Sequence, residues 1–230
     1  MSARANWDAR AEDATQVAER VDRLLSSFDQ LLGAGSSWTI VEDDSAVPTD
    51  ADQLRSVVDE HVYRDAEGIA FPARGYLLSV AREGVAGFLA IRIRVGSTTT
   101  SKRMPANAVH VTIAGPKKDG ARLSIDSDLA EGVLRGLVRA WEPDSAAVYD
   151  HDGAVAAEGR GKFAPVIGQR TWVSNRLGEV ETATSGVRLQ AGDGGQYIVA
   201  DDALDSKSAV LEVWSTLQAN GISEIARSAV

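Results

Sequence analysis

The chain has 230 residues, no cysteine and a formal net charge of −9. A chain of this length can bury a large core without cross-links, and the lack of cysteine excludes disulfides, thiolate metal sites and cysteine nucleophiles. The acidic balance argues against direct nucleic-acid binding, because phosphate contacts need clustered Lys and Arg.

The charge is distributed unevenly along the chain. Residues 82–122 hold eight Lys or Arg against Glu83 and Asp119, so this segment carries +6 and the rest carries −15 of the total of −9. An acidic remainder favours encounter with a basic protein, although solubility alone explains it at least as well.

Residues 1–7 contain one arginine and no apolar run, so we do not expect a signal peptide. No stretch is long and apolar enough to span a membrane. We therefore expect a cytoplasmic protein without a membrane partner.

Residues 7–32 are predicted to form a long amphipathic helix, because apolar residues recur at alternating spacings of four and three. A second apolar row, which includes Val17 and Leu24, makes the stripe too wide for a two-stranded coiled coil, so we expect the helix to lie on a sheet. Asn6 is the expected N-cap, and Gly33 the stop.

Three strands are predicted in the middle of the chain, at residues 76–81, 87–95 and 109–113. In the second strand Arg92 and Arg94 alternate with apolar residues, so one face is buried and the other is basic. His110 alternates with apolar residues in the third strand, which predicts a surface or half-buried side chain.

A central helix is predicted from Leu129, leading into a short buried strand that ends at Tyr149. Asp128 is the expected cap, and Pro143 ends the helix because a proline excludes the α conformation for the residue before it.

The remaining elements complete an antiparallel pattern. Helices are predicted over residues 51–62, after a cap at Asp50, and over residues 206–220; strands are predicted over residues 166–173, 187–189 and 197–199, with a loop over residues 150–161. The helices are too few to cross over between every pair of strands. We therefore predict one α+β domain over residues 1–230, a mostly antiparallel sheet with the N-terminal, central and C-terminal helices packed on it.

No residue pattern indicates catalysis, and we expect no enzyme activity and no cofactor. Asp150, His151 and Asp152 could bind a metal or hold a general base, but no second histidine lies at ligand spacing, and a solvated acidic loop is the preferred interpretation. Residues Gly159–Lys162 match part of the phosphate-loop pattern. Phe163 occupies the position at which Ser or Thr would bind magnesium, so we do not expect a phosphate loop.

Three separated patterns resemble the immunity protein 52 family of bacterial polymorphic toxin systems. They are Trp7-Asp8-Ala9-Arg10-Ala11-Glu12, Ala140-Trp141-Glu142-Pro143-Asp144 and Gly168-Gln169-Arg170-Thr171-Trp172-Val173-Ser174. Members of that family tend to begin with a short strand and a glycine after the first tryptophan, where this chain has Asp8. The resemblance implies a protein that protects its producer from a toxin encoded beside it, often a nuclease of the restriction-endonuclease-like kind.

Exposed carboxylates can approach the basic groove that a nuclease needs for phosphates. The candidate toxin-binding residues are Trp38, Glu42, Asp43 and Asp44, or Asp150, Asp152, Asp201 and Asp202. A merely solvated acidic face is an equal alternative for either cluster. For Trp38 we prefer core packing over a contact surface.

Two other classes of function stay open. A small ligand-binding or enzymatic domain would have a deep polar pocket between the sheet and the Asp150–Gly161 loop, with a perturbed His151 or carboxylate. An assembly protein would leave the apolar stripe of residues 7–32 exposed in the monomer.

Overall fold

The computed structural model describes residues 1–100 and 105–225. Within these residues nine strands form one antiparallel sheet, in the order β10 (Val187–Gly192), β11 (Gly195–Ala200), β9 (Arg170–Ser174), β8 (Ser145–Tyr149), β1 (Ser2–Trp7), β5 (Asn107–Ala114), β4 (Gly87–Val95), β3 (Tyr76–Gly84) and β2 (Thr39–Ile40). The helices are α1 (Ala14–Leu32), α2 (Ala51–Glu60), α3 (Ser127–Trp141), α4 (His151–Ala156) and α5 (Ser206–Ala219), with a short hairpin of β6 (Lys117–Lys118) and β7 (Ala121–Arg122) and a single 3₁₀ turn, η1 (Pro72–Arg74). The α+β class is confirmed.

The predicted start of the first helix is wrong. Residues 2–7 form β1 near the middle of the sheet, between β5 and β8, and Asn6 lies inside this strand. The helix begins at Ala14, where Asp13 accepts a hydrogen bond from Gln16 N at 2.9 Å and the Gln16 side chain accepts one from Asp13 N at 3.0 Å. Tertiary pairing decides this segment, because a strand built largely from alanine and polar residues has a weak local β signal.

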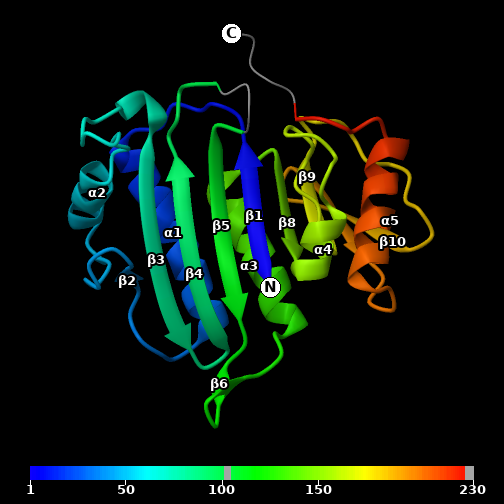
Figure 1. The fold of residues 1–230 in the computed structure, drawn as a ribbon, viewed down its shortest axis with the longest axis horizontal. Coiled ribbons are helices and arrows are strands. Elements are labelled where there is room, and N and C mark those ends of the chain that lie inside the picture. The colour runs from blue at the N-terminus through cyan, green and yellow to red at the C-terminus, as the bar shows by residue number, and fades with distance from the viewer. Residues whose placement is uncertain (101–104, 226–230) are drawn as a thin grey trace.

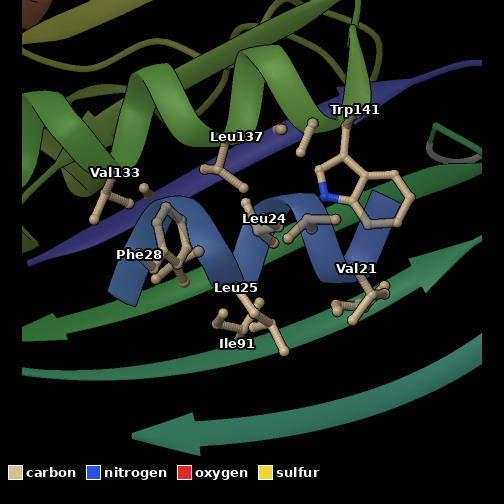
Figure 2. Close-up of a cluster of buried hydrophobic side chains, with 14 of the residues drawn as sticks. Val21, Leu24, Leu25, Phe28, Ile91, Val133, Leu137 and Trp141 are labelled. Carbon is tan, nitrogen blue, oxygen red and sulfur yellow. The ribbon is translucent and has the colours of Figure 1, made fainter. Parts of the chain in front are cut away.

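The principal core lies between one face of the sheet and the pair α1 and α3. Figure 2 shows Leu24 and Phe28 on the side of α1 that faces Leu137 of α3, and Leu25 beside Ile91 of β4. All five of these side chains are buried. The apolar stripe of α1 is therefore packed on the chain's own sheet and helix, which excludes an assembly role that needs this stripe exposed.

Among the described residues, the opposite face of the sheet is covered at one end. There α5 packs on the late strands through a second hydrophobic cluster that includes Val173, Ile198 and Val210. In Figure 1, α1 and α3 lie behind β3, β4, β5 and β1, whereas no described helix lies in front of these strands, and α4 stands beside them next to β8. We call this uncovered part of the sheet the open half-face.

Several element boundaries differ from the predictions. α2 follows Asp50 as predicted, with Asp50 accepting a hydrogen bond from Gln53 N at 3.0 Å. α3 starts earlier than predicted because Asp126, not Asp128, caps it, and it ends before Pro143 as predicted. The predicted loop over residues 150–161 contains α4, for which Asp150 is the N-cap.

The predicted strand over residues 166–173 begins only at Arg170. The residues before Arg170 form a turn, in which Thr171 Oγ1 accepts a hydrogen bond from Gly168 N at 2.9 Å. The hairpin of β10 and β11 and the C-terminal helix α5 lie close to their predicted positions.

None of the helices in the part of the chain that the structure describes is long and apolar enough to cross a membrane.

Candidate functional site

Side chains on the open half-face form a row of nitrogen-rich groups. Arg4 of β1 lies opposite His110 of β5, and His110 lies opposite Arg92 of β4. Arg94 follows two residues later on β4, on the same face. Intervening residues such as Ile91 are buried beneath α1, so the alternation of the strands itself directs these groups away from the core.

The row lies in a concave surface. We call Arg4, Arg92, Arg94, His110 and Tyr149 the basic groove; together with Ala108 they line a cavity of about 360 Å³. A second cavity of about 360 Å³, the side pocket, shares Arg4 and Tyr149 with the groove and is walled by α4 and the following segment, including Glu158, Arg160 and Lys162. The two cavities are adjacent, because Arg4 and Tyr149 line both, and we call the pair the depression.

Among the described residues that line this depression, cationic side chains outnumber carboxylates. Arg4 and Arg92 form no ion pair with another described residue. Among the residues that line the two cavities, Glu158 is the one carboxylate. Guanidinium groups held this close repel one another, and an anion between them would remove that repulsion.

The electrostatics of the groove shift several pKa values. Burial lowers the pKa of His110, and the charges of Arg4 and Arg92 lower it further, so the imidazole is neutral near pH 7. Burial, and then the same two arginines, also lower the pKa of Arg94, which still remains a cation. Burial raises the pKa of the Tyr149 hydroxyl, so it stays protonated and can donate a hydrogen bond.

Local contacts hold three of the guanidinium groups. Arg4 Nε donates to Asn6 Oδ1 at 3.0 Å, Arg94 Nη2 donates to Pro105 O at 3.0 Å, and Arg160 Nη1 donates to Ala156 O. The Arg160 guanidinium carbon also lies 5.5 Å from the centroid of the Trp214 ring. The Arg4 contact uses one of five guanidinium donors, so the group is oriented and still able to bind a ligand.

The first predicted acidic cluster lies in the turn after β2, at one edge of the sheet. Glu42, Asp43 and Asp44 are exposed. Hydrogen bonds from Ser45 lower the pKa of Asp43, and Ser45 N lies 3.0 Å from its Oδ1. Trp38 does not join this surface: it is 6% exposed, and its Nε1 donates to an oxygen of Asp29 at 2.6 Å. The contact-surface interpretation of Trp38 is therefore wrong, and core packing is its role.

The second acidic cluster, Asp150, Asp152, Asp201 and Asp202, lies at the ends of β8 and β11, and we call it the acidic edge. Burial raises the pKa of Asp150, but hydrogen bonds from Ser206 and Gly153 outweigh this effect and lower it. Asp202 lies 3.4 Å from Arg170 and is otherwise exposed. The acidic edge therefore contains one structural carboxylate, Asp150, and three exposed ones.

The structure does not bring the two acidic clusters together. Five strand spacings of about 4.8 Å separate β2 from β8, and seven separate it from β11, so the clusters lie about 24–34 Å apart across the sheet. The basic groove, on β4, β5, β1 and β8, begins two strands from β2 and adjoins the acidic edge, because Tyr149 directly precedes Asp150.

The segment around α4 has no evident metal centre. His151 is the exposed first residue of α4. In residues 1–100 and 105–225 no group of three or more His, Asp or Glu side chains is arranged to hold a metal ion.

The three sequence patterns of the resemblance meet at the C-terminal end of α3. Trp7 stacks on Trp141, with ring centroids 5.6 Å apart. Asp144 joins all three patterns, because its Oδ2 accepts a hydrogen bond from Asp8 N and its backbone oxygen accepts one from Ser174 N, both at 3.0 Å. These residues act together as a packing unit behind the sheet, away from the groove.

Three of the five side chains of the basic groove, Arg92, Arg94 and His110, follow from the sequence pattern. The basic face of β4 and the half-buried position of His110 were predicted from alternation and are confirmed. Arg4 was missed because β1 was not recognised, and Tyr149 was assigned only as a strand end. Arg160 was considered only as part of a rejected phosphate loop. The pairing of β1 with β5 and β8 is the signal that joins them.

Comparison with known proteins shows the fold. Neither a protein-family model nor a curated protein sequence matches the chain. A solved structure, Pseudomonas aeruginosa T6SS protein PA0821, is similar to it with a TM-score of 0.50 and 12% sequence identity, over 99% of this chain and 76% of that chain. The similarity therefore extends over almost the whole α+β domain.

Proposed function

We propose that this chain is an immunity protein, which binds a cognate toxin and neutralises it by non-covalent contact. The observation that carries the proposal is the segregation of surface charge: a basic groove on the open half-face, with acidic clusters toward both ends of the same sheet. Such patterning steers association and rejects partners of the wrong polarity, which suits recognition of one protein partner.

Two further observations support this proposal. The three patterns that resemble the immunity protein 52 family lie far apart in the chain and form one packed unit around Asp144. The similarity in fold to a T6SS protein fits a role in bacterial secretion or competition.

We infer that the protein acts by binding and not by catalysis. His110 is the imidazole of the groove, and its partners on the adjoining strands are Arg4 and Arg92. A nucleophile–base pair would instead place Ser, Thr or Cys within hydrogen-bond reach of the imidazole.

We propose the acidic edge as a contact for the toxin. Asp152, Asp201 and Asp202 present exposed carboxylates on one end of the sheet. If the toxin is a nuclease, as the resemblance implies, its phosphate-binding surface is basic and would meet this edge with fast, salt-dependent association.

A growth-rescue assay tests the function. The product of the neighbouring gene is expressed from an inducible promoter in a host that lacks this chain. Co-expression of this chain should restore growth, and the two proteins should copurify in equal amounts. Continued toxicity with both proteins present at equal levels would overturn the proposal.

Charge reversal tests the contact surface separately. Changing Asp152, Asp201 and Asp202 to Lys should weaken toxin binding at least tenfold and reduce its salt dependence, since charge complementarity mainly sets the association rate. Asp150 is left unchanged because it caps α4. Reversal of Glu42 and Asp44 is the matched control at the far edge. Unchanged affinity and salt slope in both variants would exclude the acidic clusters as contacts.

A ligand-binding domain is the second candidate function. The specific observation in its favour is the side pocket, which lies between the sheet and the segment from Asp150 to Gly161, where such a site was expected. A volume of about 360 Å³ is within the range of small-molecule sites, roughly 300–1,000 Å³.

A further inference from the structure

We propose that the basic groove and its side pocket bind a small, multiply charged oxyanion, a molecule with at least two phosphate or carboxylate groups. This inference concerns the ligand chemistry of the depression and does not depend on the toxin. It stands on the clustering of donors, the shape of the cavity and the charge around it.

The donors match oxyanions. Arg4, Arg92 and Arg94 carry guanidinium groups, which can bind phosphate or carboxylate oxygens in pairs. Tyr149 adds a hydroxyl that is protonated at neutral pH. A ligand would therefore meet charged donors from β1 and β4 and a neutral donor from β8.

The arrangement of cations suits two separate anionic groups. Arg4 and Arg92 lie two strands apart, about 10 Å across the sheet, with His110 between them. Arg160 and Lys162 line the side pocket on the other side of Arg4. One anionic group would lie over the row on the sheet, and the second would reach the side pocket past Arg4 and Tyr149.

The surroundings favour a small ligand over a nucleic-acid strand. The acidic edge lies to one side of the depression, and the turn with Glu42, Asp43 and Asp44 lies toward the other edge of the sheet. A long polyanion that extended beyond the depression would approach these carboxylates and be repelled. A small anion would stay within the two cavities.

Anion binding should be coupled to protonation of the His110 imidazole. The groups that face it are Arg4 from β1, Arg92 and Arg94 from β4, and Tyr149 from β8. In the free protein burial and the arginine charges hold its pKa below 6.5. A bound anion favours the imidazolium and raises that pKa, so binding takes up a proton and affinity increases as the pH falls from 7.5 to 6.

Isothermal titration calorimetry on the full chain tests the proposal, with inorganic pyrophosphate and citrate as probes at constant ionic strength. Arg4→Gln and Arg92→Gln should each weaken binding about tenfold or more, because each removes charge-assisted hydrogen bonds. Arg23→Gln is the matched control, since Arg23 is exposed on α1 behind the sheet. His110→Gln should retain binding at pH 7.5 and lose the increase in affinity at pH 6.

The probes distinguish the sources of the oxyanion. Tight binding of pyrophosphate alone would assign a phosphate-bearing ligand, and comparable binding of citrate would assign a general di- or tricarboxylate or phosphate site. Equal binding by the Arg4, Arg92 and Arg23 variants, no binding of either probe at 10 mM, or tighter binding of a single-stranded oligonucleotide would overturn the proposal. Each result is independent of whether the chain rescues cells from a toxin.

Discussion

Glu12 is a buried carboxylate that forms ion pairs with two arginines. Its side chain is 4% exposed, and its Oε1 lies 3.2 Å from Arg10 Nε and 2.6 Å from Arg20 Nε. Both arginines also donate to backbone oxygens at the end of α3, on Trp141 and Ala140. Cations at this position complement the negative end of the helix dipole, and Glu12 balances their charge.

Replacement of Glu12 by Ala should lower the free energy of unfolding by about 3–5 kcal/mol, because it removes the carboxylate that pairs with the partly buried Arg10 and leaves Arg20 with the exposed Glu142. Glu19→Ala is the control, since Glu19 is exposed on α1, which begins two residues after Glu12, and its loss should change stability by less than about 0.5 kcal/mol. Urea denaturation monitored by tryptophan fluorescence measures both. Equal effects would show that the Glu12 network does not stabilise the fold.

The lowered pKa of His110 should make stability depend on pH. Its folded-state pKa lies below the reference of 6.5, so between these values the unfolded chain binds a proton that the folded chain does not. The free energy of unfolding should therefore decrease as the pH falls from about 7.5 through 6.5 and level off below the folded pKa.

His110→Gln should reduce that decrease relative to the wild type. The comparison requires denaturation midpoints at several values of pH between 5.5 and 8. The same pH dependence in the wild type and in His110→Gln would contradict the proposed effect of burial and the arginine charges.

At the scale of elements, two glycines control how α3 approaches α1. A Cβ at Gly136 would lie 2.6 Å from Phe28 Cε1 and 2.8 Å from Ser27 Oγ. A Cβ at Gly132 would lie 2.4 Å from Leu31 Cδ2. Phe28 is fully buried, whereas Leu31 is only partly buried and can change its rotamer. An added Cβ should therefore change the free energy of unfolding by different amounts at the two positions.

Gly136→Ala should destabilise the protein by about 1–3 kcal/mol, because overpacking against Phe28 outweighs the gain in helix propensity. Gly132→Ala should be within about 1 kcal/mol of the wild type, since the propensity gain offsets the movement of Leu31. Thermal and urea unfolding of both variants measure the difference. A larger loss for Gly132→Ala would contradict this account of the helix interface.

The correctly predicted elements are those in which apolar side chains repeat at regular spacing over many residues. α3, α5 and the pair β3 and β4 carry side chains that repeat at helical or strand spacing, so local pattern and tertiary position agree. β1 was missed because its short alanine-containing pattern is decided by β5 and β8. α4 was missed because it has only six residues and begins in a segment that looked like an acidic loop.

At the scale of the whole molecule, the sheet places acidic and basic side chains on different surfaces, and composition alone does not reveal this arrangement. The acidic clusters were predicted as candidate contacts from the sequence alone, and the structure places them five to seven strands apart, about 24–34 Å across the sheet. The basic groove could not be predicted as a unit, because Arg4, Arg92 and Tyr149 come from three distant segments and meet only through strand pairing. The exposed acidic edge and the groove give the molecule two surfaces of opposite polarity.

The most direct measurement of the central claim is the binding of the purified chain to a catalytically inactive form of the neighbouring gene's product. Isothermal titration calorimetry, and size-exclusion chromatography with light scattering, should detect a stable complex of fixed stoichiometry. Added salt should weaken the binding. The acidic-edge variant with Asp152, Asp201 and Asp202 changed to Lys should bind more weakly than the variant of Glu42 and Asp44. Separate elution of the two wild-type proteins, with no heat of binding at micromolar concentration, would contradict the immunity function.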